Sequence, residues 1–318
     1  MEDNALPAGA SAPRGQLISH SPDPPPQDEA LLRSVRSRLI AAHADAPAQL
    51  DVLLCQVDAL WTFEFGRFLL RNRGLNADWA HQIVTYRPGT LTPASTPALQ
   101  YALFERLPSM LATRERFGIF RRQLQRLLRP GLTLASIPCG YMSELLTLDY
   151  RHCPDVRLLG SDLDPQALEG ARALAQQHGL ERQVALQLAD AWAPGEPDSV
   201  DVLTSNGLNI YEPDDARVVA LYRAFFARLR PAGMLVTSCL TPSPAQSAQS
   251  PWKLAAIDAC AAHLQAQLFR EVIQTHINVR TPAHTRAQLE RAGFVDVRVI
   301  EDSAGIFPTF IASKPGPG

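Results

Sequence analysis

The spacing of apolar residues changes abruptly about 130 residues into the chain. Before that point apolar residues recur every three or four positions, as at Leu31, Val35 and Leu39, which is typical of helices that bury one face. The same spacing predicts further helices over residues 48–74, 76–86 and 108–128. The first of these is apolar nearly all round and ends at Gly74, which suits a C-terminal cap. We therefore expect an all-helical region over residues 28–130.

From residue 131 short apolar strands alternate with helices. The pattern predicts strands at 132–137, 156–164, 184–190, 199–207 and 234–240, with helices at 142–149, 165–179 and 213–229 between them. Asp164 is placed to cap the second of these helices, and Pro165 stands at its first position. Strands joined by helices in this way form a parallel sheet with helices on both faces.

The C-terminal pattern differs from this alternation. A helix is expected at 281–293, followed by strands at 294–302 and 309–314. The loop between these strands is too short for a parallel crossover, so they must pair antiparallel. The predicted fold class is thus α/β: a Rossmann-like, seven-stranded, mostly parallel sheet with an antiparallel C-terminal hairpin, plus an all-helical N-terminal region. The sheet and the helices that cover it are expected over residues 131–318, with an insertion at about 242–280.

Composition limits the remaining possibilities. Residues 1–27 contain six prolines and few apolar residues, which predicts a disordered tail. The net charge is −2, so we expect neither nucleic acid nor a membrane as partner. Five cysteines are scattered without Cys-x-x-Cys spacing, which indicates neither a metal site nor a disulfide framework. Because the chain begins without the basic and apolar segments of a secretory signal, we expect a cytoplasmic protein with reduced thiols.

Candidate binding residues lie where the predicted strands end. In open α/β sheets a ligand sits outside the carboxyl ends of the strands. Gly140 would let the backbone approach such a ligand closely, and Asp162 could accept hydrogen bonds from both hydroxyls of a ribose. Asp190 could accept from the exocyclic amine of a purine, and Leu163 and Trp192 could form its apolar walls.

At this point the chain resembles the class I S-adenosylmethionine-dependent methyltransferases, over about residues 131–315. The segments "GSDLDP", "LADAW", "LRPAGMLV" and "LERAGF" correspond to later motifs of that family. The first motif reads acid-x-Gly-x-Gly-x-Gly in the family and "SIPCGYM" here, so Ser136 replaces the acid and only Cys139–Gly140 is kept. A sulfonium nucleoside has no pyrophosphate and requires only one close backbone approach.

The resemblance implies S-adenosylmethionine as the cofactor. The phrases "ASIPCG", "SNGLNIYEPDD" and "FGRFLLRNRGLN" also resemble a bacterial subgroup with a helical N-terminal region. The cofactor-binding residues implied are Ser136, Pro138, Cys139, Gly140, Asp162, Leu163, Asp190, Ala191, Trp192 and Asn206. Methyl transfer depends chiefly on alignment and needs a base only if the acceptor loses a proton in that step. Tyr211 and Glu212 follow the fourth strand and are the candidates for such a base or for positioning the acceptor.

The expected function is methyl transfer to a small-molecule acceptor. The helical region and the insertion would cover the crevice, although the helices could instead form a homodimer. A nicotinamide-dependent dehydrogenase is disfavoured because Gly-x-Gly-x-x-Gly is missing and a C-terminal hairpin is present. Two alternatives stay open. One is a methyltransferase that acts on RNA or protein. The other is a catalytically silent domain that binds the cofactor or a partner, which the altered first motif allows.

Overall fold

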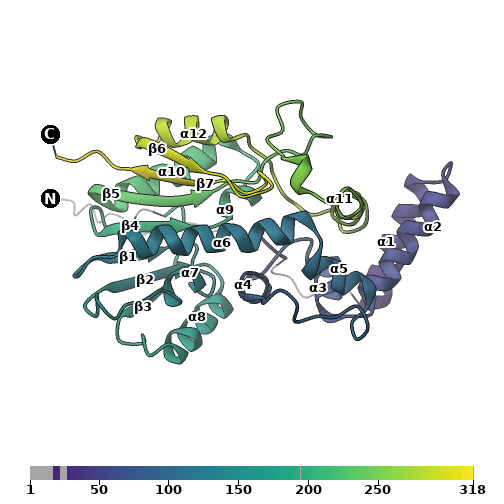
Figure 1. The fold of residues 1–318 in the computed structure, drawn as a ribbon, viewed down its shortest axis with the longest axis horizontal. Helices are drawn as coiled ribbons and strands as arrows, with labels where there is room; N and C mark the ends of the chain where they lie inside the picture. Colours follow the sequence, from purple (N-terminus) through teal and green to yellow (C-terminus); the bar gives the residue numbers. More distant parts are fainter. Residues whose placement is uncertain (1–16, 22–26, 194, 318) are drawn as a thin grey trace, which may run out of the picture.

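A computed structural model describes residues 17–21, 27–193 and 195–317. It contains a seven-stranded sheet in the order β3-β2-β1-β4-β5-β7-β6, with helices on both faces and a helical region beyond one end (Figure 1). The strands are β1 (Thr133–Ser136), β2 (Arg157–Asp162), β3 (Val184–Leu188), β4 (Val200–Ser205), β5 (Leu229–Ser238), β6 (Val295–Ile300) and β7 (Thr309–Ser313). The first five strands are parallel, and β7 runs antiparallel between β5 and β6. The predicted fold is confirmed.

Alternating side chains of each central strand enter two different cores, as the pleat of a strand requires. Leu134 of β1 shares a core with helices α6 (Pro108–Leu127), α7 (Ser143–Leu146) and α8 (Pro165–Gln177). The next residue, Ala135, shares the opposite core with α10 (Asp215–Arg228) and α12 (Pro282–Arg291). Because both faces are covered, the central strands β1 and β4 are buried at nearly every position, whereas the edge strand β3 is largely exposed. Asp164 caps α8 as predicted, since its Oδ1 accepts from the N–H of Gln166 at 2.9 Å.

The N-terminal helices form a core separate from the two cores of the sheet, except that the C-terminal half of α6 packs on the sheet. They are α1 (Asp28–Ala42), α2 (Pro47–Trp61), α3 (Glu64–Asn72), α4 (Ala77–Thr85), α5 (Ala98–Glu105) and α6. The single helix predicted over 48–74 is wrong, because the chain breaks between α2 and α3. At the break, Gly66 packs so closely on Leu60 that a Cβ atom would lie 2.1 Å from the Leu60 carbonyl oxygen. The predicted cap at Gly74 is also wrong, since Arg73 adopts the left-handed conformation at the end of α3.

The insertion packs on the N-terminal helices. It contains the short η1 (Leu254–Ala256), α11 (Ala259–Ala266) and the π-helix η2 (Gln267–Val272). Buried residues of α11 and η2 share one core with α1 to α5, and Figure 1 shows α11 lying between the sheet and α1 and α2. The Arg38 guanidinium of α1 donates to the carbonyls of Glu271 and Val272, at 2.6 Å each. Two segments more than 200 residues apart thus form one helical unit.

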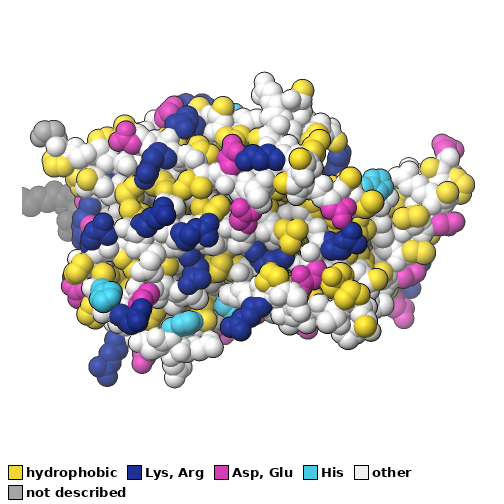
Figure 2. All heavy atoms as spheres, viewed as in Figure 1, with side chains coloured by type: hydrophobic (Ala, Val, Ile, Leu, Met, Phe, Trp, Pro, Cys, Tyr) yellow, Lys and Arg dark blue, Asp and Glu magenta, His cyan; other side chains and the backbone are white. Residues whose placement is uncertain are grey.

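On the face in view, Lys and Arg side chains lie close together along α6, and Asp and Glu side chains are scattered around them (Figure 2). The arginines Arg122, Arg126 and Arg129 of α6 and the loop after it are exposed, as expected of a solvated helix face.

Within the described ranges, no helix is both long enough and apolar enough to span a bilayer.

Candidate functional site

A cavity of about 610 Å³ lies over the carboxyl ends of the strands. That volume is typical of small-molecule sites. Its walls come from the loops after β1, β2, β3 and β4, from α4 and α6, and from the insertion. The cavity has two sides, which take their names from the roles that the sequence predicts for Asp162 and Tyr211. The nucleoside side is formed by Gly140, Asp162, Leu163, Asp190 and Trp192, and the acceptor side by Arg116, Tyr211, Leu240 and Phe307.

Asp162 organises the nucleoside side through backbone hydrogen bonds. Its Oδ2 accepts from the N–H of Gly140 at 2.9 Å, and its Oδ1 accepts from the N–H of Asp164 at 3.0 Å. Gly140 is in the left-handed region, with φ at 49°, and a Cβ there would come no closer than 3.8 Å to Ala77, so its conformation matters more than space. Burial raises the pKa of Asp162, although these backbone bonds oppose the rise. Since each carboxylate oxygen can accept more than one bond, Asp162 keeps capacity for a ligand.

Ser136 does not line the cavity, which corrects its predicted role as a direct contact. It is buried at the end of β1, and its hydroxyl donates to Oε1 of Glu144 at 2.6 Å. Glu144, in the first turn of α7, lines the cavity and is 6% exposed. Burial raises the pKa of Glu144, and its bond from Ser136 and the charge of Arg116 act in the opposite direction. A carboxylate eight residues further along the chain is therefore held against Ser136, the position at which the family's first motif has its acid.

The loop after β3 forms the far wall of the nucleoside side. Asp190, Ala191 and Trp192 all line the cavity, as does Leu163 after β2. Asp190 Oδ1 accepts from the N–H of Trp192 at 3.0 Å, which turns the chain at this point. The indole N–H donates to the Arg217 carbonyl at 2.9 Å, and the Arg217 guanidinium lies 4.8 Å from the ring centroid. The indole is thus held in place as a wall.

Pro138 and Cys139 also line the cavity, from the loop after β1. Burial strongly raises the pKa of the Cys139 thiol, and the thiol donates weakly to the Gly140 carbonyl at 3.4 Å. A thiol held in its neutral form is a poor nucleophile, so Cys139 serves as a small apolar contact.

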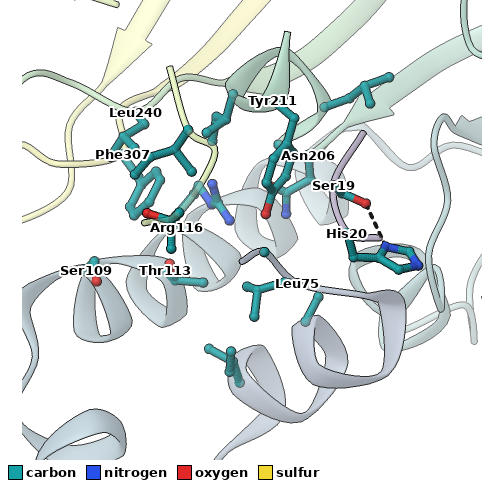
Figure 3. A pocket seen from close by; sticks show the side chains of 18 of the residues that line it. Ser19, His20, Leu75, Ser109, Thr113, Arg116, Asn206, Tyr211, Leu240 and Phe307 are labelled. Carbon is teal, nitrogen blue, oxygen red and sulfur yellow. Dashed lines mark hydrogen bonds between the residues drawn. The ribbon is translucent and has the colours of Figure 1, made fainter. Parts of the chain in front are cut away.

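The two residues predicted for catalysis are placed differently. Tyr211, at the end of α9 (Leu208–Tyr211), lines the cavity with its hydroxyl pointing inward, beside Asn206 (Figure 3). Burial raises the pKa of Tyr211, so it is a neutral hydrogen-bond donor at neutral pH. Glu212 is absent from the cavity wall: its carboxylate accepts from Arg217 at 2.7 Å and from the N–H of Asp214 at 3.0 Å. The predicted role of Glu212 as a base is therefore wrong.

Sequence reasoning missed the other residues of the acceptor side. Arg116 and Phe117 reach the cavity from α6, and Phe307 enters from the loop before β7. Met110, Ile83, Phe269 and Val279 add apolar surface from α6, α4 and the insertion. Figure 3 shows Arg116, Tyr211 and Phe307 directed into the same space. Arg116 occurs eight residues before Leu124 in the helical pattern, which places a charge on an apolar face and could have identified it.

Part of the predicted N-terminal tail lies in the site, which corrects its assignment as wholly disordered. Leu17, Ile18, Ser19 and His20 line the cavity, and His20 Nε2 is 3.7 Å from Oδ2 of Asp164. Gly74 makes room for this segment, because a Cβ there would lie 1.9 Å from the Ser19 carbonyl oxygen. The predicted tail otherwise falls on residues 1–16 and 22–26, outside the described ranges, and on Gln27.

The strand order and the antiparallel C-terminal pair match the Rossmann-like fold of the S-adenosylmethionine-dependent methyltransferases. The S-adenosylmethionine-dependent methyltransferase SibL, in its apo form, shares this fold at 17% identity, with a TM-score of 0.50 over 86% of this chain and 76% of that one. A possible exported protein from Bordetella parapertussis is 51% identical, with a TM-score of 0.85 over 91% of this chain and 95% of that one. The chain belongs to the same family as this Bordetella protein. No family model and no curated protein matches it.

Proposed function

We propose that the protein is an S-adenosylmethionine-dependent methyltransferase that acts on a small-molecule acceptor. The observation that carries the proposal is a pair of buried carboxylates that face one cavity, Asp162 at the end of β2 and Glu144 in the first turn of α7. Buried carboxylates are costly unless paired or hydrogen-bonded, so two of them in one cavity favour a ligand with hydroxyls and a cation. When bound, the cofactor would supply a methyl group on a sulfonium sulfur.

The residues of the nucleoside side suit the parts of this cofactor. Asp162 would accept hydrogen bonds from the ribose hydroxyls, and Asp190 with Trp192 would contact the adenine. Glu144, held by Ser136, would pair with the amino group of the methionine moiety. The Oδ1 atom of Asn206 is buried without a hydrogen-bond partner among the described residues, so it too is free to accept from a ligand. The altered first motif is therefore compatible with binding.

The acceptor side would position the second substrate and exclude water. Tyr211 is neutral and can donate a hydrogen bond to an acceptor oxygen or nitrogen. The insertion and α4 line the cavity with apolar side chains, which suits a transfer that depends on alignment. A small acceptor fits a cavity of about 610 Å³ better than a nucleic acid or a folded protein does. The cytoplasmic location, the bacterial subgroup and a dimer through the N-terminal helices stay predictions.

A ligand-binding experiment tests the proposal. S-adenosylhomocysteine at 100 times its dissociation constant should stabilise the protein by about 2.7 kcal/mol, which raises the melting temperature by several degrees. NAD at the same concentration serves as the control and should give no shift. A shift with NAD and none with S-adenosylmethionine or S-adenosylhomocysteine would refute the proposal. Transfer of a radiolabelled methyl group from S-adenosylmethionine then distinguishes an enzyme from a silent binding domain.

A further inference from the structure

Arg116 is a buried cation that faces the cavity without a full set of partners. It is 7% exposed, whereas Arg121, Arg122 and Arg126 of the same helix are exposed. Among the described residues its only hydrogen bond runs from Nη1 to Ser238 Oγ at 3.3 Å, and its buried Nε has no partner. No ion pair joins it to any carboxylate within the described ranges.

The two carboxylates whose charges act on Arg116, Asp302 and Glu144, already accept other hydrogen bonds. Asp302 accepts three backbone N–H groups in its own loop, from Ala304, Ile306 and Phe307, at 3.1, 3.1 and 2.6 Å. Glu144 accepts from Ser136. Burial lowers the pKa of Arg116 to about 10, and it is still protonated at neutral pH. A protonated guanidinium that faces a cavity with free donors is a site for an anionic group of a ligand.

The surroundings of Arg116 indicate what else that ligand carries. Its guanidinium lies over the Phe307 ring, 4.5 Å from the centroid, and Phe117, Leu240 and Val279 add apolar surface nearby in the wall. The planar fork of an arginine matches a carboxylate, which it can bind through two parallel hydrogen bonds. A flat or extended apolar body with one carboxylate would satisfy both the charge and the walls.

The position of Arg116 assigns it to the acceptor side. Its partner Ser238 ends β5, whereas Asp162 ends β2, and β1 and β4 lie between these two strands. At a spacing of about 4.8 Å between strands, the two ends are about 14 Å apart. Figure 3 shows the Arg116 side chain directed toward Tyr211, which belongs to the same side.

We propose that Arg116 binds the carboxylate of an acceptor whose body is apolar, such as an aromatic or aliphatic carboxylic acid. This substrate class rests on the proposed methyltransferase function. The other source of a carboxylate is the methionine moiety of the cofactor, and the experiment is arranged to separate the two.

The test measures binding of benzoate, 2-naphthoate and decanoate, each against its neutral primary amide, by calorimetry with and without saturating S-adenosylhomocysteine. The wild-type protein should bind at least one acid about 10- to 100-fold more tightly than its amide. Arg116→Met should remove this preference and change the affinity for S-adenosylhomocysteine by less than about twofold. Arg122→Met, on the exposed face of the same helix, is the matched control and should keep the preference.

The outcomes distinguish this inference from the proposed function. If no acid is preferred over its amide, the inference is overturned. It is also overturned if Arg116→Met weakens the binding of S-adenosylhomocysteine but not that of methylthioadenosine, which lacks the carboxylate. That result would mean that Arg116 binds the carboxylate of the cofactor. If S-adenosylhomocysteine fails to bind while an acid is preferred, the proposed function fails and the anion site stands. Should Arg116→Met not fold, Arg116→Lys must keep a weakened preference for the acid.

Discussion

The nucleoside side and the acceptor side of the cavity are built in different ways. The nucleoside side consists of consecutive strand ends, and its turns are fixed by short-range backbone bonds such as those from Gly140 and Asp164 to Asp162. The acceptor side draws Arg116, Tyr211 and Phe307 from α6, α9 and the loop before β7, which are far apart in sequence. Local chain geometry therefore determines where the cofactor would bind, whereas tertiary packing determines what the acceptor can be.

The largest expected effect separates catalysis from cofactor binding. Tyr211→Phe should lower the rate of methyl transfer by about 10²-fold at saturating cofactor, because a misplaced acceptor is costly to a transfer that depends on alignment. Its affinity for S-adenosylhomocysteine should be unchanged. The measurement is transfer of radiolabelled methyl to any acid that the wild-type protein methylates.

Glu212→Gln is the matched control, since Glu212 lies outside the cavity wall and pairs with Arg217. It should keep turnover within about twofold. If Glu212→Gln loses as much activity as Tyr211→Phe, the loop acts as one structural unit, and the distinction between the two residues is wrong.

A smaller effect is expected on the nucleoside side. Asp162→Asn should weaken the binding of S-adenosylhomocysteine by about 1.5–3 kcal/mol, the usual range for hydrogen bonds to a charged group. Calorimetry would measure this change. Asp155→Asn, an exposed change just before β2, should have no effect. An unchanged affinity in Asp162→Asn would mean that another residue contacts the ribose.

The raised pKa of Asp162 gives this prediction a pH dependence. Because folding raises the pKa of Asp162, protonated Asp162 stabilises the folded state at low pH. This contribution to the free energy of unfolding is lost as the pH rises through the raised pKa. Cofactor binding depends on pH in the opposite direction, since the ionised carboxylate of Asp162 is the better hydrogen-bond acceptor. Affinity should therefore fall on acidification, beginning above the ordinary aspartate range of about pH 4, and should fall less in Asp162→Asn. The charges of Asp164 and of protonated His20 act on Asp162.

The smallest expected effect concerns the N-terminal segment. Deleting residues 1–21 removes the part of the cavity wall that contacts Gly74 and Asp164. The deletion should weaken the binding of S-adenosylhomocysteine by about 0.5–1.5 kcal/mol. Deleting residues 1–16 keeps that contact and should leave the affinity unchanged. Equal affinities for the two deletions would show that this segment makes no contribution to binding.

Sequence reasoning succeeded where a residue's position follows from a periodic pattern. Asp162 and Asp190 each follow a strand of a β/α alternation, so their common location was predictable. Glu144 was missed because its helix α7 has only four residues, which is too short for a periodic pattern to assign a face. Ser19 and His20 were missed because a proline-rich composition indicates disorder, and their docking depends on the room that Gly74 leaves. Glu212 was misassigned because the sequence does not show the direction of a side chain in a turn.

The joint helical unit of α1 and η2 has a consequence for biosynthesis. Arg38 needs carbonyl partners that are 233 and 234 residues further along the chain. At roughly 5–20 residues per second, a ribosome takes on the order of 10–50 s to produce them. During that interval the apolar faces of the N-terminal helices lack the α11 and η2 surfaces that later cover them. The nascent chain should therefore expose these apolar helical surfaces until η2 has been synthesised, and during that interval we expect it to bind chaperones.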